Sequence, residues 1–145
     1  MAVFPSVQWF DAVRGVFNAD ESYQGGGGGA CNALMGLKIA GQSFLVTFEG
    51  AECSAAVKVQ DNDLAAADYI LEMSYADWKD MIQNIAQNGH ADLHHTLNTL
   101  DLGRAEGLSH SMHGDQYRED LFFRYNQTMQ YFFDASARVA TEFTE

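Results

Sequence analysis

The stretch from Phe44 to Gly89 constrains the fold of this chain most strongly. It holds three short runs rich in β-branched or aromatic residues and separated by turn residues, namely Phe44–Phe48, Ala55–Val59 and Asp68–Met73. Such runs predict strands. The segment after Ser74 has helical spacing. This order predicts an α+β fold, with an antiparallel or mixed sheet packed on helices and an apolar cavity between the two layers.

The strands alternate in character along their length. In the first, Phe44, Val46 and Phe48 share one face, while Leu45 and Thr47 share the other. The third places Tyr69, Leu71 and Met73 on one face and Ile70 and Glu72 opposite. Successive side chains of a strand point to opposite faces, so each strand has a face suited to lining a core or a cavity. Periodicity does not distinguish these two uses.

Helical spacing predicts three helices. The first runs from about Ser6 to Phe17, with Ser6 as N-cap. The second begins after Ser74, where Asp77 completes a pattern like a capping box. Its apolar stripe consists of Trp78, Met81, Ile82 and Ile85, and Asn88-Gly89 predicts its end. The third covers residues 115–140 and carries one broad, largely aromatic stripe of Leu121, Phe122, Tyr125, Met129, Phe132, Phe133 and Ser136.

Two segments interrupt this pattern. Residues 24–30 contain five consecutive glycines and predict a flexible loop, either a plain surface loop or a mobile lid. A phosphate loop is excluded there because no Gly-Lys-Ser/Thr follows. The segment from His90 to Met112 predicts a short helix that leads into a strand.

Composition limits the function. The 145 residues predict a single domain, 1–145, and the formal charge of −12 disfavours nucleic acid and anionic membranes as partners. No apolar run is long enough to insert stably in a bilayer, and no leader is recognisable, so we expect a cytoplasmic protein. Cys31 and Cys53 form no CxxC motif and are expected to be free, buried thiols.

The region from Leu34 to Gly89 resembles the sterol carrier protein type 2 family of lipid-binding domains. The resemblance rests on the strands Phe44–Glu49 and Ala55–Gln60, the segment Ala66-Ala-Asp-Tyr-Ile-Leu-Glu-Met-Ser74, and Trp78 in the helix that follows. After Gly89 the chain departs from the family pattern. The resemblance implies an α+β domain that encloses a tunnel for fatty acyl chains, sterols or similar apolar molecules.

The leading hypothesis is therefore binding or carriage of a hydrophobic small molecule in an internal cavity. The residues expected to line it are Phe44, Val46, Tyr69, Leu71, Trp78, Ile82, Phe122, Tyr125 and Met129. The alternative is a small cofactor-independent isomerase, hydratase or lyase acting on an apolar substrate. Its candidate acids and bases are Glu72, His94 and His110. The sequence leaves open whether the protein is an enzyme.

The five histidines form two groups. On a helix His90 and His94 would share a face, as would His110 and His113. Imidazoles at this spacing can ligate metals, but no HExxH or paired CxxC accompanies them, so no metal and no cofactor is expected. A solvated segment with pH-sensitive charge is the favoured interpretation. The C-terminal helix or the acidic surface also leaves a homodimer open.

Overall fold

The computed structural model describes residues 2–20, 32–50, 52–97, 100, 109–110 and 116–143, without the side chains of 109–110, 116–120, 122–124 and 126. Its elements are β1 (Ala2–Phe4), α1 (Val7–Ala19), β2 (Ala33–Ile39), β3 (Gln42–Glu49), β4 (Glu52–Val59), the 3-10 helix η1 (Asp61–Ala66), β5 (Tyr69–Glu72), α3 (Tyr75–Asn88), β6 (Ser109–His110), α5 (Gln116–Asp134), the 3-10 helix η2 (Ala135–Arg138) and β7 (Thr141–Phe143).

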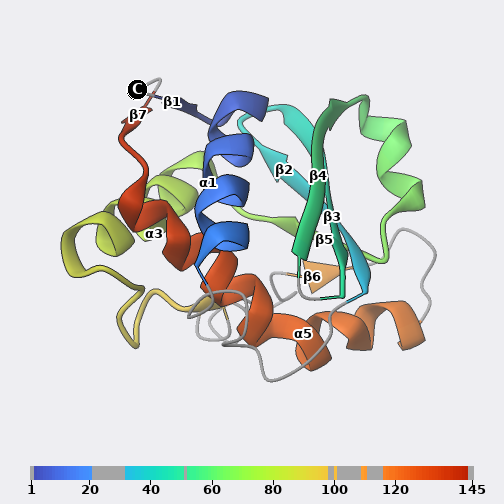
Figure 1. Cartoon of the computed structure of the whole chain (residues 1–145). Helices are drawn as coiled ribbons and strands as arrows, with labels where there is room; N and C mark the ends of the chain where they lie inside the picture. Colours follow the sequence, from blue (N-terminus) through green and yellow to red (C-terminus); the bar gives the residue numbers. More distant parts are fainter. Residues whose placement is uncertain are drawn as a thin grey trace.

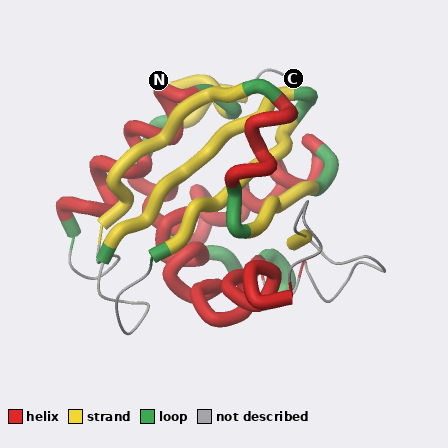
Figure 2. Tube along the Cα trace, turned by 90° about the vertical axis from the view of Figure 1, so that its right-hand side faces the viewer, coloured by secondary structure: helices red, strands yellow, loops and turns green. Residues whose placement is uncertain are grey.

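Five strands form one sheet in the order β4-β3-β2-β5-β6. Helices α1, α3 and α5 lie on its inner face, and η1 crosses the outer face (Figure 1 and Figure 2). β2, β3 and β4 form an antiparallel meander, whereas β5 runs parallel to β2. The predicted mixed sheet covered by helices is therefore confirmed.

The β2–β3 hairpin is closed by the two residues Ala40 and Gly41. Their φ angles are 52° and 76°, so both are in the left-handed region. A two-residue loop of this kind matches the twist of the paired strands. It places Ile39 opposite Gln42 and thereby sets the register that brings Leu37 opposite Phe44.

The two faces of the sheet are both apolar but differ in what covers them. The inner face carries Phe44, Val46 and Phe48, which are at most 2% exposed and pack against the helices. On the outer face, Ile70 forms a small second cluster with Leu64 of η1 and Ala67. The alternation predicted for the first and third strands is confirmed, because each strand divides its side chains between the two clusters.

The helix boundaries follow the predicted caps. The Oγ of Ser6 accepts a hydrogen bond from the N–H of Trp9 at 3.0 Å and begins α1. The Oγ of Ser74 accepts from the N–H of Asp77 at 3.2 Å and begins α3. Gly89 ends α3 with φ 82°, a conformation that costs glycine little.

The C-terminal helix is shorter than residues 115–140. α5 ends at Asp134, and the chain continues as η2 and then as β7. Ser136, expected on the helical stripe, is buried in η2 instead. The chain leaves the helix there because β7 pairs in parallel with β1, which joins the two ends of the described chain. Nε1–H of Trp9 in α1 donates to Oγ1 of Thr141 in β7 at 3.0 Å.

Other predicted features fall partly outside the described residues. The glycine loop at 24–30 and Cys31 lie outside them, while Cys53 is buried, as expected. In the segment after α3, residues 93–95 form a turn, Leu97 and Leu100 are helical, and the two-residue strand β6 lies at Ser109–His110. No described helix is long and apolar enough to cross a membrane.

Candidate functional site

Eight of the nine residues predicted to line a ligand chamber lie in the layer between the sheet and the helices. Four elements place them: Phe44 and Val46 lie on β3, Tyr69 and Leu71 on β5, Trp78 and Ile82 on α3, and Phe122, Tyr125 and Met129 on α5. Seven of the nine are at most 1% exposed and belong to one hydrophobic cluster. Tyr125 packs against that cluster, and the side chain of Phe122 lies outside the described part of α5.

Large side chains pack against one another in this layer. The rings of Trp78 and Phe133 lie 5.7 Å apart, and Nε1–H of Trp78 donates to the carbonyl of Lys38 at 3.3 Å, which fixes α3 against β2. Four methionines are also in the cluster: Met35, Met73, Met81 and Met129. Methionine is flexible and adapts its shape to its neighbours. The position and size of a chamber within this layer stay a prediction.

One hollow lies outside the layer, where β2, β3 and β5 meet η1 and the start of α3. It has a volume of about 310 Å³ and is bordered by Lys38, Asp61 and Glu72. Nζ of Lys38 lies 3.2 Å from Oδ1 of Asp61. Glu72, the candidate acid or base, is exposed and stands opposite Lys38 in the β2–β5 register. Its side chain therefore lies at a solvated polar rim and not among the apolar side chains.

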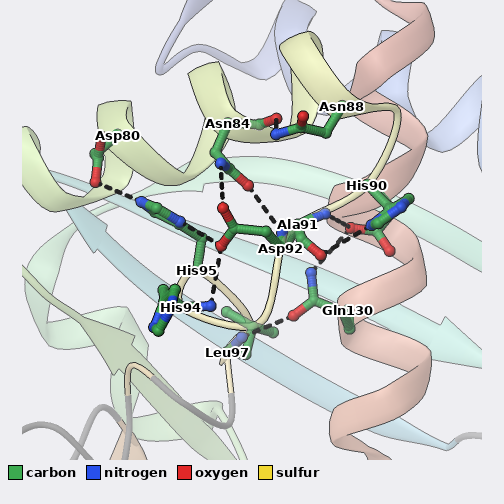
Figure 3. Close-up of polar contacts among 11 residues, drawn as sticks. Asp80, Asn84, Asn88, His90, Ala91, Asp92, His94, His95, Leu97 and Gln130 are labelled. Carbon is green, nitrogen blue, oxygen red and sulfur yellow. Dashed lines mark hydrogen bonds and ion pairs between the residues drawn. The ribbon is translucent and has the colours of Figure 1, made fainter.

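A second polar feature joins α3 to the segment that follows it. Nδ1 of His95 lies 2.6 Å from Oδ1 of Asp92, and Nε2 of His95 lies 2.9 Å from Oδ2 of Asp80 (Figure 3). Both partners are carboxylates and accept hydrogen bonds. Neutral imidazole has a single N–H, so only the protonated ring donates to both. The arrangement therefore favours the imidazolium form.

The pKa values of this pair shift as the geometry requires. The hydrogen bond to Asp92 raises the pKa of His95 above 6.5, with a further contribution from Asp80. Hydrogen bonds from His95, Asn84 and the N–H of His94 lower the pKa of Asp92 from 3.8 to about 2, although desolvation opposes them. The contribution of His95 to stability is lost as pH rises through its raised pKa. The contribution of Asp92 is lost as pH falls below 3.8 towards 2.

Asn84 of α3 holds the same aspartate from a second direction. Its Nδ2 donates to Oδ2 of Asp92 at 2.9 Å, and its Oδ1 accepts the N–H of Asp92 at 2.9 Å (Figure 3). Oε1 of Gln130 accepts the N–H of Leu97 at 2.7 Å. The segment 90–97 is thus fastened to α3 at Asp92 and to α5 at Leu97.

Asp134, the last residue of α5, is the most deeply buried carboxylate among the described residues, with 7% of its surface exposed. Its Oδ1 accepts the N–H of Ala91 at 3.1 Å and Nε2–H of Gln130 at 3.0 Å. Burial raises the pKa of Asp134, and these two hydrogen bonds oppose the shift. A hollow of about 360 Å³ lies over it, lined by His90, Ala91, Thr96, Gln127, Gln130, Tyr131 and Asp134. Neither hollow is lined by any of the nine predicted residues.

The histidine predictions need one correction. His90 and His94 do not share a helical face, because α3 ends at Asn88 and residues 93–95 form a turn. Nδ1 of His90 lies 2.9 Å from the carbonyl of Ala91, and His94 is exposed. The side chain of His110 and all of His113 lie outside the described residues. Among the described residues, no group of three His, Cys, Asp or Glu side chains could hold a metal ion.

Sequence reasoning missed Asp134 and the hollow over it, although a signal was present. Gln127, Gln130, Tyr131 and Asp134 follow the spacing i, i+3, i+4 and i+7, so they form a polar stripe on α5 beside its apolar stripe. A polar stripe is usually a solvated helix face. What turned it into the wall of a hollow is the segment 90–97, which packs over it.

The fold defines the class of the protein: an α+β domain with a mixed sheet packed on helices. The same fold occurs in the solution structure of TT1886 from Thermus thermophilus, a conserved hypothetical protein that has been suggested to be a sterol carrier protein. The two match with a TM-score of 0.63 and 17% identity over 94% of this chain and 90% of that chain. At this identity the likeness is one of fold. No protein-family model matches the sequence, and no curated protein matches it.

Proposed function

We propose that this protein binds a hydrophobic small molecule, such as a fatty acyl chain or a sterol-like compound, between its sheet and its helices. The observation that carries the proposal is the fold, which matches TT1886 over nearly the whole chain. The apolar layer supplies a second argument. The inner face of the sheet and α3 border this layer, and apolar side chains such as Leu71 and Ile82 are buried there.

The chemistry of the layer suits an apolar guest. Burial of an acyl chain contributes about 0.8 kcal/mol per methylene, so ten methylenes give about 8 kcal/mol, which corresponds to micromolar affinity before the costs of association. Met73, Met81 and Met129 are the side chains best able to move for a guest, because each turns about unbranched bonds. We therefore expect these methionines to adapt the shape of the chamber to different guests.

Two measurements test the proposal. Mass spectrometry of an organic extract of the purified protein is expected to find a co-purified lipid. The stripped protein is expected to bind a fluorescent fatty acid at micromolar concentration and to release it when unlabelled fatty acid or sterol is added. An extract without lipid, together with no saturable binding of the fluorescent probe, would contradict the proposal.

A further inference from the structure

The polar face of α5 borders a hollow that is separate from the predicted apolar chamber. The hollow over Asp134 has a volume of about 360 Å³, within the usual size of small-molecule sites, and it shares no residue with the predicted apolar chamber. Its walls are the α5 stripe of Gln127, Gln130 and Tyr131 on one side and residues of the segment 90–97 on the other. This inference is therefore independent of the proposed lipid function.

The buried carboxylate at this hollow uses only one of its oxygens for structure. Oδ1 of Asp134 accepts two hydrogen bonds: one from the N–H of Ala91, which fastens the segment 90–97 to α5, and one from Nε2–H of Gln130 within α5. Among the described residues, none donates a hydrogen bond to Oδ2. Oδ2 is also not fully buried. A carboxylate oxygen can accept more than one hydrogen bond, so Oδ2 is an acceptor available at the wall of the hollow.

The surroundings determine which donor fits this acceptor. Of the described residues that line the hollow, none is a lysine or arginine, and His90 is a basic side chain whose charge interacts with Asp134. The chain as a whole carries a formal charge of −12, which draws cations towards it. The ring of Tyr131 and the methyl group of Ala91 provide apolar surface beside the carboxylate. A metal ion is a poor occupant because no second carboxylate from the described part of the chain lines the hollow.

We propose that the hollow over Asp134 binds a small primary ammonium ion with a short alkyl body. The ammonium group donates to Oδ2 of Asp134, and Gln127, which also lines the hollow, offers its side-chain oxygen as a second acceptor. The alkyl body lies against the ring of Tyr131. The Coulombic attraction between an ammonium and a carboxylate is stronger in a partly buried hollow than at an open surface.

Substitution of Asp134 by asparagine separates this role from the structural one. The Asn oxygen can still accept from Ala91 and Gln130, whereas its NH₂ group replaces Oδ2 with a donor. Asp134→Asn is therefore expected to keep the segment fastened and to lose the cation. Asp11→Asn is the matched control, because it removes the same charge from an exposed position on α1.

The assay is a ¹H–¹⁵N NMR titration of the whole chain with n-butylammonium chloride, with n-butanol and sodium butyrate as neutral and anionic counterparts. In the wild type and in Asp11→Asn, butylammonium is expected to shift the amides of Ala91, Gln130 and Asp134 saturably, and butanol and butyrate are not. In Asp134→Asn the affinity is expected to fall at least tenfold. Equal affinity in Asp134→Asn, or no saturable shift in the wild type, would overturn the proposal.

A thermal melt shows whether Asp134→Asn is folded. If it is not, the wild type alone decides between the outcomes. Saturable shifts with butylammonium at concentrations where butanol gives none support the site. Equal responses to the two compounds would refute it, because they would indicate a hollow that recognises only the alkyl group.

Discussion

Truncation of Ile82 distinguishes a ligand chamber from a completely filled core. Ile82 and Ile85 lie one turn apart on α3, are 1% and 0% exposed, and belong to the same hydrophobic cluster. Only Ile82 is predicted to touch a guest. Ile→Ala removes three carbons, worth about 2.4 kcal/mol at about 0.8 kcal/mol each, and the cavity left behind raises the usual cost to about 2–5 kcal/mol. Ile85→Ala is expected to show this full cost.

In protein stripped of lipid, Ile82→Ala is expected to cost about half as much as Ile85→Ala, because a side chain that lines a chamber loses contacts on one side only. Urea unfolding followed by the fluorescence of the buried Trp9 and Trp78 measures both costs. In the loaded protein the side of Ile82 that faces the chamber contacts the guest. Ile82→Ala should therefore weaken binding of a fluorescent fatty acid by about 1.4 kcal/mol, or tenfold. Ile85→Ala should leave this affinity unchanged.

The reasoning would be refuted if the two variants lose the same stability in stripped protein and bind the fatty acid equally well. That result would mean that Ile82 is packed on all sides in the free protein and that any guest lies elsewhere. A loss of affinity in Ile85→Ala alone would place the chamber deeper along α3 than predicted.

Three further predictions concern the scaffold. A Cβ added at Gly36 would meet its nearest side-chain carbons at 3.1 Å, so Gly36→Val should cost about 1–3 kcal/mol in urea unfolding, and Gly36→Ala should cost less. His95→Gln should lower the melting temperature most between about pH 4 and pH 6.5, where the protonated His95 and the ionised Asp92 coexist, and an equal loss at pH 9 would contradict this. Asn18→Leu should cost about 1–3 kcal/mol, because the Asn18 amide pairs with both the N–H and the C=O of buried Cys53 at 2.8 and 2.9 Å; a guanidinium titration that shows no change in midpoint would exclude it.

The sequence identified the elements that depend on local signals. Strands β3, β4 and β5, the N-caps Ser6 and Ser74, and the end of α3 at Gly89 lie close to their predicted positions. Alternation along a strand and hydrogen bonding at a helix end are set by neighbouring residues, so they can be read without the fold. The same signals carried the resemblance that led to the fold class.

The pairing of distant segments came only from the tertiary structure. Asp68, part of the motif behind the family resemblance, accepts the N–H of Leu34 at 2.8 Å with its Oδ2 and so begins the parallel pairing of β2 with β5. The pairing of β1 with β7 also lacks a local signal. The predicted helix over 115–140 therefore extended too far, and α5 ends at Asp134.

The polar sites likewise depend partly on local sequence and partly on tertiary packing. The sequence determined that α5 has an apolar stripe for the core and that His95 lies among polar residues. The tertiary structure decided that His95 lies between Asp80 and Asp92 and that the carboxylate of Asp134, which is 43 positions from Ala91, fastens the segment that follows α3. The physical reason is that a helix turn fixes only neighbours three and four positions apart. Which distant group a buried carboxylate meets depends on how the helices and the sheet pack.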